Sequence, residues 1–518
     1  MGVPEEIRRV PRPSNTVVVD NGTEGVKRYA VRARSGVRYV PGGNPQPVNG
    51  SVIGYIADGR FVPISEPAGY EPQELSYGSM ALIKSVSRDI LDDLLDVYGM
   101  DIGYGIMAVA ALRVAIPHVT DKRLSTHYKR TFASIFYPGV AISRNSVCTL
   151  HKMVGMNGPK RKEFYTKRIQ AVSEEHHIAI DGTLKTDNSS VNDLSDFSYK
   201  SRVRGTKDVS VIYAYDVERR EPICAQVFPG NCTDASAYAE FIRENDISKG
   251  IIVADKGFPP SRIREELGRR PQLHFLTPIK RNDIRIVNNS MLDFEEVLKN
   301  TEHNVMCKKR CIQGGMYLYA FRDPYKASLE EMTYLGRKST QKAFDFGKYS
   351  KKDRNFGTIV FESDLDMDCE TAYRCYDDRW LLEMVFNYYK NDEFLDSTRV
   401  QGDFSVYGSE FINSIATMIT CRIIRRFTET KLLEDASYRE VMDDLSSAWR
   451  KIDAPVPPSR TDGAWVHTLP NVHETLEKLG LSEGPVLPEP KKRGRPRKQA
   501  TQDRPKRPRG RPRKNPVS

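Results

Sequence analysis

The sequence predicts an α/β protein, because its central region, residues 171–282, alternates strand and helix signals. The nearly continuous apolar run GIIVADKGF is typical of a strand buried on both faces. The segment DASAYAEFIREND has helical spacing and opens at Asp234. Over 518 residues, 39% hydrophobic and 28% charged content indicates a globular chain with several domains. No apolar run of about 18 residues occurs, so we expect no membrane partner.

Residues 1–70 form the first predicted element, a small β-rich module. They are rich in glycine, proline and β-branched residues. The pair Asp58-Gly59 lies between SVIGYIA and RFVPI, which is a two-residue hairpin signal. We interpret this module as a docking or stabilising appendage.

Residues 71–170 are predicted to be helical, because apolar residues recur every three or four positions in SMALIKSVSRDILDDLLDVYG and YGIMAVAALRVAI. Within this region, GVAISRNSVCTLHKMVG places polar residues after a turn and before an apolar-spaced segment. Recognition helices of helix-turn-helix proteins commonly have this pattern. A DNA-binding helix-turn-helix and a plain helical bundle both fit.

Residues 171–282 are expected to hold the first part of a catalytic core. The segment HHIAIDGT predicts a short strand ending in Asp181, VSVIYAYDV and EPICAQVF predict two strands of a meander, and GIIVADKGF ends in Asp255. Acidic residues at the carboxyl ends of strands lie where an α/β sheet presents its binding crevice. We therefore expect Asp181 and Asp255 to lie side by side, the alternative being two ordinary turn or N-cap residues.

A helix is predicted over Tyr376–Lys390, YDDRWLLEMVFNYYK. At about 100° per residue, Tyr376, Arg379, Glu383 and Lys390 fall on one narrow face. Such a helix face is suited to contact the phosphate backbone of DNA, while the carboxylate of Glu383 holds a metal ion. The alternative is a solvated helix face.

Three carboxylates, Asp181, Asp255 and Glu383, suit phosphodiester chemistry. Hydrolysis or transfer at DNA needs an activated attacking oxygen and a neutralised leaving oxygen, and two divalent ions about 4 Å apart provide both. Mg²⁺ and Mn²⁺ prefer hard oxygen ligands. Three carboxylates brought together would therefore suit catalysis with two Mg²⁺ or Mn²⁺ ions.

These residues carry a resemblance to the DDE transposases of bacterial insertion sequences, in the branch with the Y-R-E-K signature. The spacing Y-x2-R-x3-E-x6-K is met at every position. The motifs that carry the resemblance are Asp181-Gly182-Thr183, Pro229-Gly230-Asn231 with Asp234, Ala254-Asp255-Lys256-Gly257-Phe258, and Tyr376, Arg379, Glu383 and Lys390. The resemblance covers about residues 176–425.

The resemblance implies a ribonuclease H-like core with Asp181, Asp255 and Glu383 as metal ligands and Tyr376, Arg379 and Lys390 as phosphate contacts. It also implies binding to terminal inverted repeats, cutting at the element ends, attack of the freed 3′-hydroxyl on target DNA, and a homodimer that pairs two ends. Some relatives stack a tryptophan of an inserted segment on a flipped base.

Three further segments are predicted between the first part of the core and the tail. Residues 283–357 are predicted to be a mostly β insertion, 358–430 the second part of the core, and 431–480 C-terminal helices. No tryptophan lies in the insertion. A stacking role there would fall to an aromatic residue such as Tyr317, Tyr319, Phe321 or Tyr334.

Residues 481–518 are predicted to be a linker and a disordered basic tail. Between Lys491 and Lys514 there are 13 lysines and arginines and one acid, a net charge of +12, which leaves the rest of the chain at −1 out of a total of +11. RGRPRK occurs twice and resembles an AT-hook, a motif that suits narrow A/T-rich minor grooves. The DNA-binding residues expected here are Arg493, Gly494, Arg495, Pro496, Arg497, Arg509, Gly510, Arg511, Pro512 and Arg513.

The sequence thus predicts a transposase acting on double-stranded DNA in the cytoplasm, at the nucleoid. Two other classes remain open, an architectural or regulatory DNA-binding protein without catalysis and a stand-alone metal-dependent nuclease. Strand-transfer products would distinguish the transposase from the nuclease, and metal-dependent cleavage would exclude the architectural protein.

Overall fold

The computed structural model describes most of the chain and divides it into two compact units, residues 1–73 and 74–518. We call them the N-terminal unit and the main unit and treat each by itself. The described residues are 2–38, 46–63, 73–187, 189–198, 201, 205–232, 234–254, 265–299, 301–339, 345–377, 397–453, 458–460 and 462–483.

The N-terminal unit is an antiparallel sheet in which consecutive strands pair in the order β1-β2-β3-β4. A short helix, α1 (Glu5–Arg8), precedes it. Asp58 and Gly59 connect the last two strands, and both have positive φ, as a tight two-residue hairpin turn requires. The predicted hairpin is therefore confirmed. The strand bounds are β1 (Thr16–Asp20), β2 (Tyr29–Arg38), β3 (Gln46–Ala57) and β4 (Arg60–Pro63).

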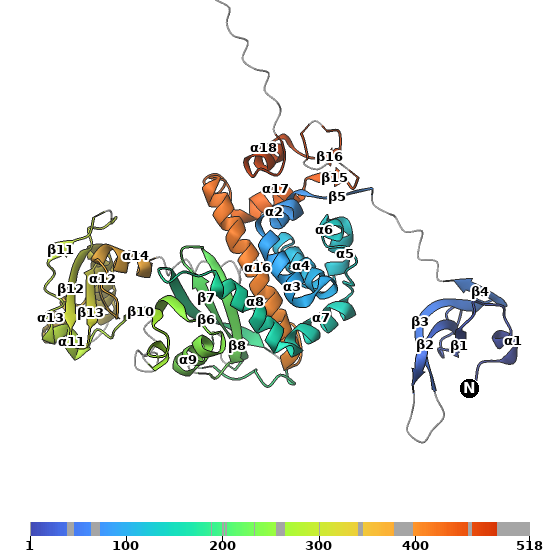
Figure 1. The fold of residues 1–518 in the computed structure, drawn as a ribbon, viewed down its shortest axis with the longest axis horizontal. Helices are drawn as coiled ribbons and strands as arrows, with labels where there is room; N and C mark the ends of the chain where they lie inside the picture. Colours follow the sequence, from blue (N-terminus) through green and yellow to red (C-terminus); the bar gives the residue numbers. More distant parts are fainter. Residues whose placement is uncertain are drawn as a thin grey trace, which may run out of the picture. The chain divides into compact units, whose positions relative to one another are not determined.

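The main unit begins with a layer of helices over residues 78–170 (Figure 1). The first apolar-spaced segment forms two helices, because the chain breaks at Ser87, whose hydroxyl donates a hydrogen bond to the Ile83 carbonyl. Gly99, with φ of +77°, separates the second helix from the third. The helices are α2 (Gly78–Val86), α3 (Arg88–Tyr98), α4 (Met100–Ala115), α5 (Leu124–Arg130), α6 (Ala133–Phe136), α7 (Arg144–Met156) and α8 (Gly158–Gln170).

A mixed sheet follows, and the described part of it has nine strands in the order β11-β12-β13-β14-β10-β9-β6-β7-β8. Its core half has β6, β7 and β8 as an antiparallel meander, with β9 parallel to β6 and β10 parallel to β9. The helix α9 (Asp234–Glu244) connects β8 to β9, as predicted. The strand bounds are β6 (His177–Asp187), β7 (Lys207–Asp216), β8 (Glu221–Pro229), β9 (Lys249–Ala254), β10 (Gln272–Pro278), β11 (Glu296–Val297), β12 (Met306–Ile312), β13 (Met316–Arg322) and β14 (Thr358–Ser363).

The segment 283–357, predicted to be mostly β, is instead mixed. Its strands continue the core sheet, because β14 pairs with both β13 and β10. Asp323 accepts hydrogen bonds from the backbone N–H groups of Tyr325 and Lys326 and so starts a long helix that the strand signals obscured. The helices are α11 (Ile284–Asn288), α12 (Pro324–Ser339) and α13 (Phe346–Asp353), and α14 (Cys369–Asp377) follows β14.

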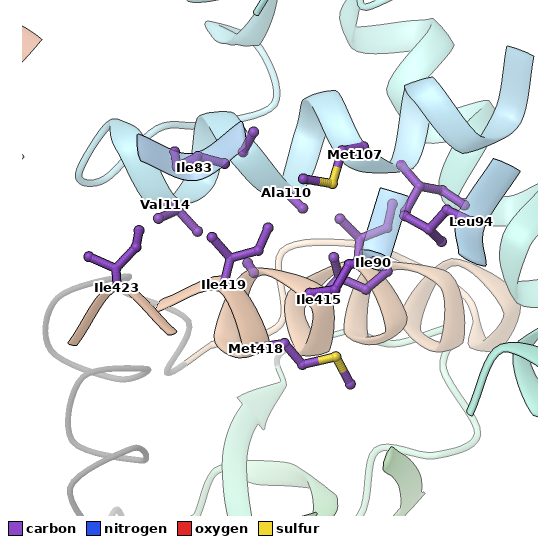
Figure 2. Packing of buried hydrophobic residues seen from close by; sticks show 14 of the residues in the cluster. Ile83, Ile90, Leu94, Met107, Ala110, Val114, Ile415, Met418, Ile419 and Ile423 are labelled. Carbon is purple, nitrogen blue, oxygen red and sulfur yellow. The ribbon is translucent and has the colours of Figure 1, made fainter. Parts of the chain in front are cut away.

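The helix α16 (Asp403–Glu429) lies between the helical layer and the sheet (Figure 1). Figure 2 shows Ile415 and Ile419 of α16 directed toward the helices of that layer, whereas Met418 points to the opposite side. All three side chains are fully buried. Burial of both faces explains why nearly every residue from Val406 to Ile423 is inaccessible to solvent, and it makes α16 the central element of the main unit.

The helices α7 and α16 approach each other closely at two glycines. A Cβ at Gly155 would lie closer than 3.0 Å to the carbonyl oxygen of Phe404, and one at Gly408 closer than 3.0 Å to that of His151. Both neighbours are backbone atoms, which cannot rotate away. The two backbones are therefore in direct contact, and the contact fixes where the side chains of α7 face α16.

A group of four charged residues, three of them buried and the fourth, Asp89, exposed, joins α16 to the sheet and the helical layer, and we call it the charged cluster. Arg422 donates hydrogen bonds to Glu221 on β8 and, at 2.9 Å, to Asp89 on α3. Arg168 on α8 donates to the same two carboxylates at 3.2 and 2.9 Å. Because the charges neutralise one another, Arg168, Glu221 and Arg422 can be buried.

The C-terminal part of the main unit contains both helices and strands. Residues predicted to continue a helix at WRKI instead form a strand, which pairs with residues at the start of the main unit. The indole of Trp465 stacks with the Arg450 guanidinium, whose carbon lies 4.4 Å from the ring centroid, so tertiary contacts override the helical signal. The elements are β5 (Glu74–Ser76), α17 (Tyr438–Ser446), β15 (Trp449–Lys451), β16 (Trp465–His467) and α18 (Pro470–Lys478). None of the helices in the described ranges combines the length and apolarity needed to cross a bilayer.

Candidate active site

Asp181 lies in the middle of β6, not at the end of a strand as predicted. The strand continues through LKTD, three of whose four residues are charged or polar, to Asp187, and Asp181 pairs with Tyr213 of β7. The polar residues are tolerated because several find partners within the main unit. One example is Lys185, which donates a 2.6 Å hydrogen bond to Glu410 of α16. Gly182, which was expected to follow the end of the strand, therefore occupies an ordinary position within β6.

Asp181 lies one residue beyond the described pairing of β6 with β9. The parallel partner β9 pairs with β6 only from His177 to Ile180, and Ile180 faces Ala254, the last residue of β9. Asp255 is the next residue in sequence and lies outside the described residues. Asp181 therefore directly follows the last residue of β6 that pairs with a described residue of β9.

The carboxylate of Asp181 is half-buried. Its Oδ1 accepts a 2.8 Å hydrogen bond from the Gly182 N–H and a 3.5 Å contact from the hydroxyl of Tyr238 on α9. An aspartate carboxylate is negatively charged at neutral pH. Asp181 therefore combines negative charge with partial solvent access, which are the properties that a ligand for a hard divalent ion needs.

Tyr376 lies in the last turn of α14, a helix that begins at Cys369, seven residues earlier than the predicted one. Its ring packs on Phe361 of β14, with 4.5 Å between the centroids. The ring is thus half-buried rather than standing on a fully solvated face. Arg379, Glu383 and Lys390 lie outside the described residues, as do all the AT-hook residues from Arg493 to Arg513.

Two of the four candidate stacking residues are excluded by burial. Tyr319 and Phe321 on β13 are at most 1% exposed, so neither ring has a face open to a base. Tyr317 is partly exposed, and the ammonium of Lys309 lies 5.4 Å from its centroid. Tyr334 is also partly exposed and packs on Phe356.

A second group of potential ligands, which the sequence reasoning missed, lies where β6 begins and β7 ends. Ligand atoms of His176, Asp216 and Glu218 lie within 4.8 Å of one another. His176 already contacts Asp216 at 2.8 Å, and Glu218 accepts a 2.8 Å hydrogen bond from the His177 N–H. We therefore regard this group as a hydrogen-bonded contact of the sheet, separate from Asp181.

The chain is similar to known proteins in two segments. Residues 173–408 match the family model described as a transposase DDE domain, and residues 490–502 and 506–518 each match the AT hook motif. The chain therefore contains a transposase DDE domain, which runs from just before β6 into α16, and two AT-hook motifs. No curated protein has a sequence that matches this chain.

Among solved structures, one to which the chain is similar is a cryo-EM structure of a piggyBac transposase synaptic complex with hairpin DNA. Its TM-score is 0.38 at 12% sequence identity, and the similarity covers 72% of this chain and 80% of that chain.

Proposed function

We propose that this protein, which carries a transposase DDE domain followed by two AT hooks, is a metal-dependent DNA transposase. In this proposal it binds the terminal inverted repeats of its element, cleaves at the ends and transfers the freed 3′-hydroxyl strands to target DNA. A homodimer would pair the two ends. The observation that carries the proposal is the position of Asp181 beside the end of β9.

The strand arrangement supports a ribonuclease H-like core. A meander of β8, β7 and β6 is extended by the parallel strands β9 and β10, and Asp181 lies on the central strand β6. Since β6 and β9 run parallel with Ile180 opposite Ala254, the residues that follow are Asp181 and Asp255. We infer that their carboxylates lie side by side.

We propose Asp181, Asp255 and Glu383 as the ligands of two divalent ions, Mg²⁺ or Mn²⁺. The half-buried carboxylate of Asp181 fits this role because its oxygens are hard donors and remain partly accessible. When bound, such ions supply activation of the attacking oxygen and neutralisation of the leaving oxygen. Arg379 and Lys390 would hold phosphates near the cut, and the hydroxyl of Tyr376 would extend beyond its ring contact with Phe361.

We expect Asp181→Asn to lower metal-dependent DNA cleavage by at least about a thousandfold, because losing a metal-binding charge costs several kcal/mol of transition-state stabilisation. The assay is cleavage and joining of DNA that carries the ends flanking the protein's own gene, with a supercoiled target, in Mg²⁺, Mn²⁺ or chelator. DNA binding should remain near that of the unaltered protein. The exposed Asp193→Asn serves as a matched control and should cleave normally.

The same assay separates the alternatives. Cleavage that needs metal and Asp181 but yields no joined products would assign a stand-alone nuclease. Binding of the ends without any cutting would favour an architectural DNA-binding protein. Loss of both binding and cleavage in Asp181→Asn would mean that Asp181 is structural.

We also propose that the two AT hooks bind A/T-rich minor grooves through Arg493–Arg497 and Arg509–Arg513. Each hook places arginines around a Gly-Arg-Pro centre, where glycine leaves room for the chain to enter a narrow groove. These residues carry most of the net positive charge, so they should supply most of the non-specific affinity for DNA.

Truncation after Pro490 is expected to weaken DNA binding and to flatten its dependence on salt. Each phosphate contact contributes about 0.9 to the slope of log K against log salt concentration, so losing several contacts lowers the slope by several. Fluorescence anisotropy with an A/T-rich duplex at a series of salt concentrations measures this. An unchanged slope in the truncated protein would refute the assigned role of the tail.

A further inference from the structure

A polar cavity of about 650 Å³ lies among α7, α16 and the far end of β6. Three residues of α7, Arg144, Cys148 and His151, line it at spacings of four and three and therefore share one helix face. Ser409 and Asn413 line it from α16. The backbone contact at Gly155 and Gly408 holds the two helices in this relation.

The carboxylates inside the cavity are already neutralised. Lys185 on β6 donates to Glu410 at 2.6 Å, and both side chains are at most 3% exposed. Arg113 on α4 donates to Asp121 at 3.2 Å and to Asn413 at 2.5 Å. The two acids thus each pair with one cation and leave no negative charge for a ligand to oppose.

Three further cations line the cavity. Lys122 and Arg144 are exposed, and neither makes an ion pair or side-chain hydrogen bond with another described residue. Arg399 also lines the cavity. Cations therefore outnumber carboxylates in the lining by five to two, which favours an anionic ligand.

A buried hydrogen-bond donor is also unused. His151 is fully buried, and its Nε2 lies 3.2 Å from the Nη2 of Arg113, which can only donate. Burial, together with Arg113, lowers the pKa of His151 to about 4, so the neutral ring carries its hydrogen on Nδ1. This Nδ1 has no hydrogen-bond partner among the described residues, and the nearest carboxylate oxygen, on Asp121, is 3.8 Å away. Such a donor is costly to leave unpaired.

We propose that this cavity binds a phosphate group of the DNA strand that passes Asp181. The inference rests on the proposed function, because it takes the strand to be bound at Asp181. Lys122 and Arg144 provide the charge at the opening, and the hydroxyl, amide and imidazole groups inside provide hydrogen-bonding capacity. Phosphate oxygens accept from all of these groups.

The position of the cavity along β6 fits this ligand. Asp181, Thr183 and Lys185 alternate with their neighbours and therefore lie on one face of the strand. Lys185 is four residues beyond Asp181, which corresponds to about 13 Å. A DNA strand carries one phosphate per about 3.4 Å of helix axis, so about four nucleotides cover this distance. The two sites can thus contact the same strand.

The exposed thiol of Cys148 is a reporter inside the cavity. The experiment measures its alkylation by iodoacetamide in the full chain, by mass spectrometry, with and without a short mixed-sequence duplex. With the duplex at ten times its dissociation constant, about one eleventh of the protein is free, so alkylation should slow about tenfold. The exposed Cys311 in the same molecule provides an internal reference for reagent activity.

The double variant Lys122→Ala/Arg144→Ala should lose this protection while remaining bound to DNA through its tail. Its salt slope should fall by about two, one contact for each cation removed. Lys152→Ala, an exposed lysine of α7 outside the cavity, is the matched control and should keep full protection. Each rate is compared with that of the same variant without DNA, which cancels any change in thiol reactivity.

Two outcomes would overturn the proposal. Protection by inorganic phosphate without protection by the duplex would assign a free anion instead of a DNA strand. No protection by either would show that the cavity holds no phosphate. If Cys148 is protected by DNA but the unaltered protein fails to cut under any metal condition, the cavity assignment stands and the proposed transposase activity fails.

Discussion

Gly408→Ala is expected to destabilise the main unit by about 2 kcal/mol. The new methyl group would press on the carbonyl oxygen of His151, and overpacking of this kind costs up to about 3 kcal/mol, occasionally more, because backbone atoms cannot rotate aside. The higher helix propensity of alanine offsets only about 1 kcal/mol of this destabilisation. The two helices must therefore move apart, and the cavity between them should lose its shape.

Hydrogen exchange measures this effect at the helices concerned. A loss of about 2 kcal/mol corresponds to exchange roughly thirtyfold faster for the amides of α7 and α16. The matched control is Gly336→Ala on α12, where a Cβ meets nothing within 4 Å. That change should leave the main unit unaffected or stabilise it by about 0.5–1 kcal/mol. Unchanged exchange in Gly408→Ala would mean that α7 and α16 are not held in backbone contact.

Arg422→Met in the charged cluster is expected to cost about 3 kcal/mol at neutral pH. Glu221 is 2% exposed, and removal of one partner leaves a buried carboxylate with insufficient compensation. Methionine retains most of the side-chain volume, so packing is little changed. Urea unfolding at pH 7 measures the cost. Arg88→Met, an exposed position on α3 beside the cluster, should change stability by less than about 0.5 kcal/mol.

The same substitution should have a pH signature. Burial alone would raise the pKa of Glu221, but hydrogen bonds and attraction from Arg422, Arg168 and Arg219 hold it below the usual value. A carboxyl whose pKa is lowered by folding stabilises the protein above its unfolded pKa, about 4.3, and loses that contribution as the pH falls through its folded pKa. The difference in the free energy of unfolding between Arg422→Met and the unaltered protein should therefore have its full value at pH 7 and shrink below about pH 4. A difference that is constant with pH would show that Arg422 acts through packing alone.

Local sequence patterns predicted the elements whose signals are themselves local. The Asp58-Gly59 turn depends on two residues that tolerate positive φ. The strands β7, β8 and β9 depend on continuous apolar runs. In each case the residues that define the element are neighbours in the chain, so the pattern could be read without knowing the tertiary structure.

The features that the sequence did not predict depend on partners far away in the chain. The strand β6 extends past Gly182 because Lys185 finds Glu410, 225 residues later. Residues 449–451 form a strand because residues 74–76 pair with them. The His151 donor and the cations around the cavity come from separate elements, so their meeting leaves no pattern in any short window. The one signal of the cavity available in the sequence was Lys185, a lysine in a strand otherwise rich in buried residues.

The central position of α16 has a consequence for how the protein is made. The apolar faces of α2, α3 and α4 pack on α16, but Ala115 at the end of α4 is synthesised 288 residues before Asp403 at the start of α16. At about 5–20 residues per second, the ribosome needs ~15–60 s to cover that distance. During this time the early helices have no permanent partner and expose apolar surface. We therefore expect the nascent chain to depend on chaperones until α16 emerges, and a chain interrupted before residue 403 to aggregate rather than fold.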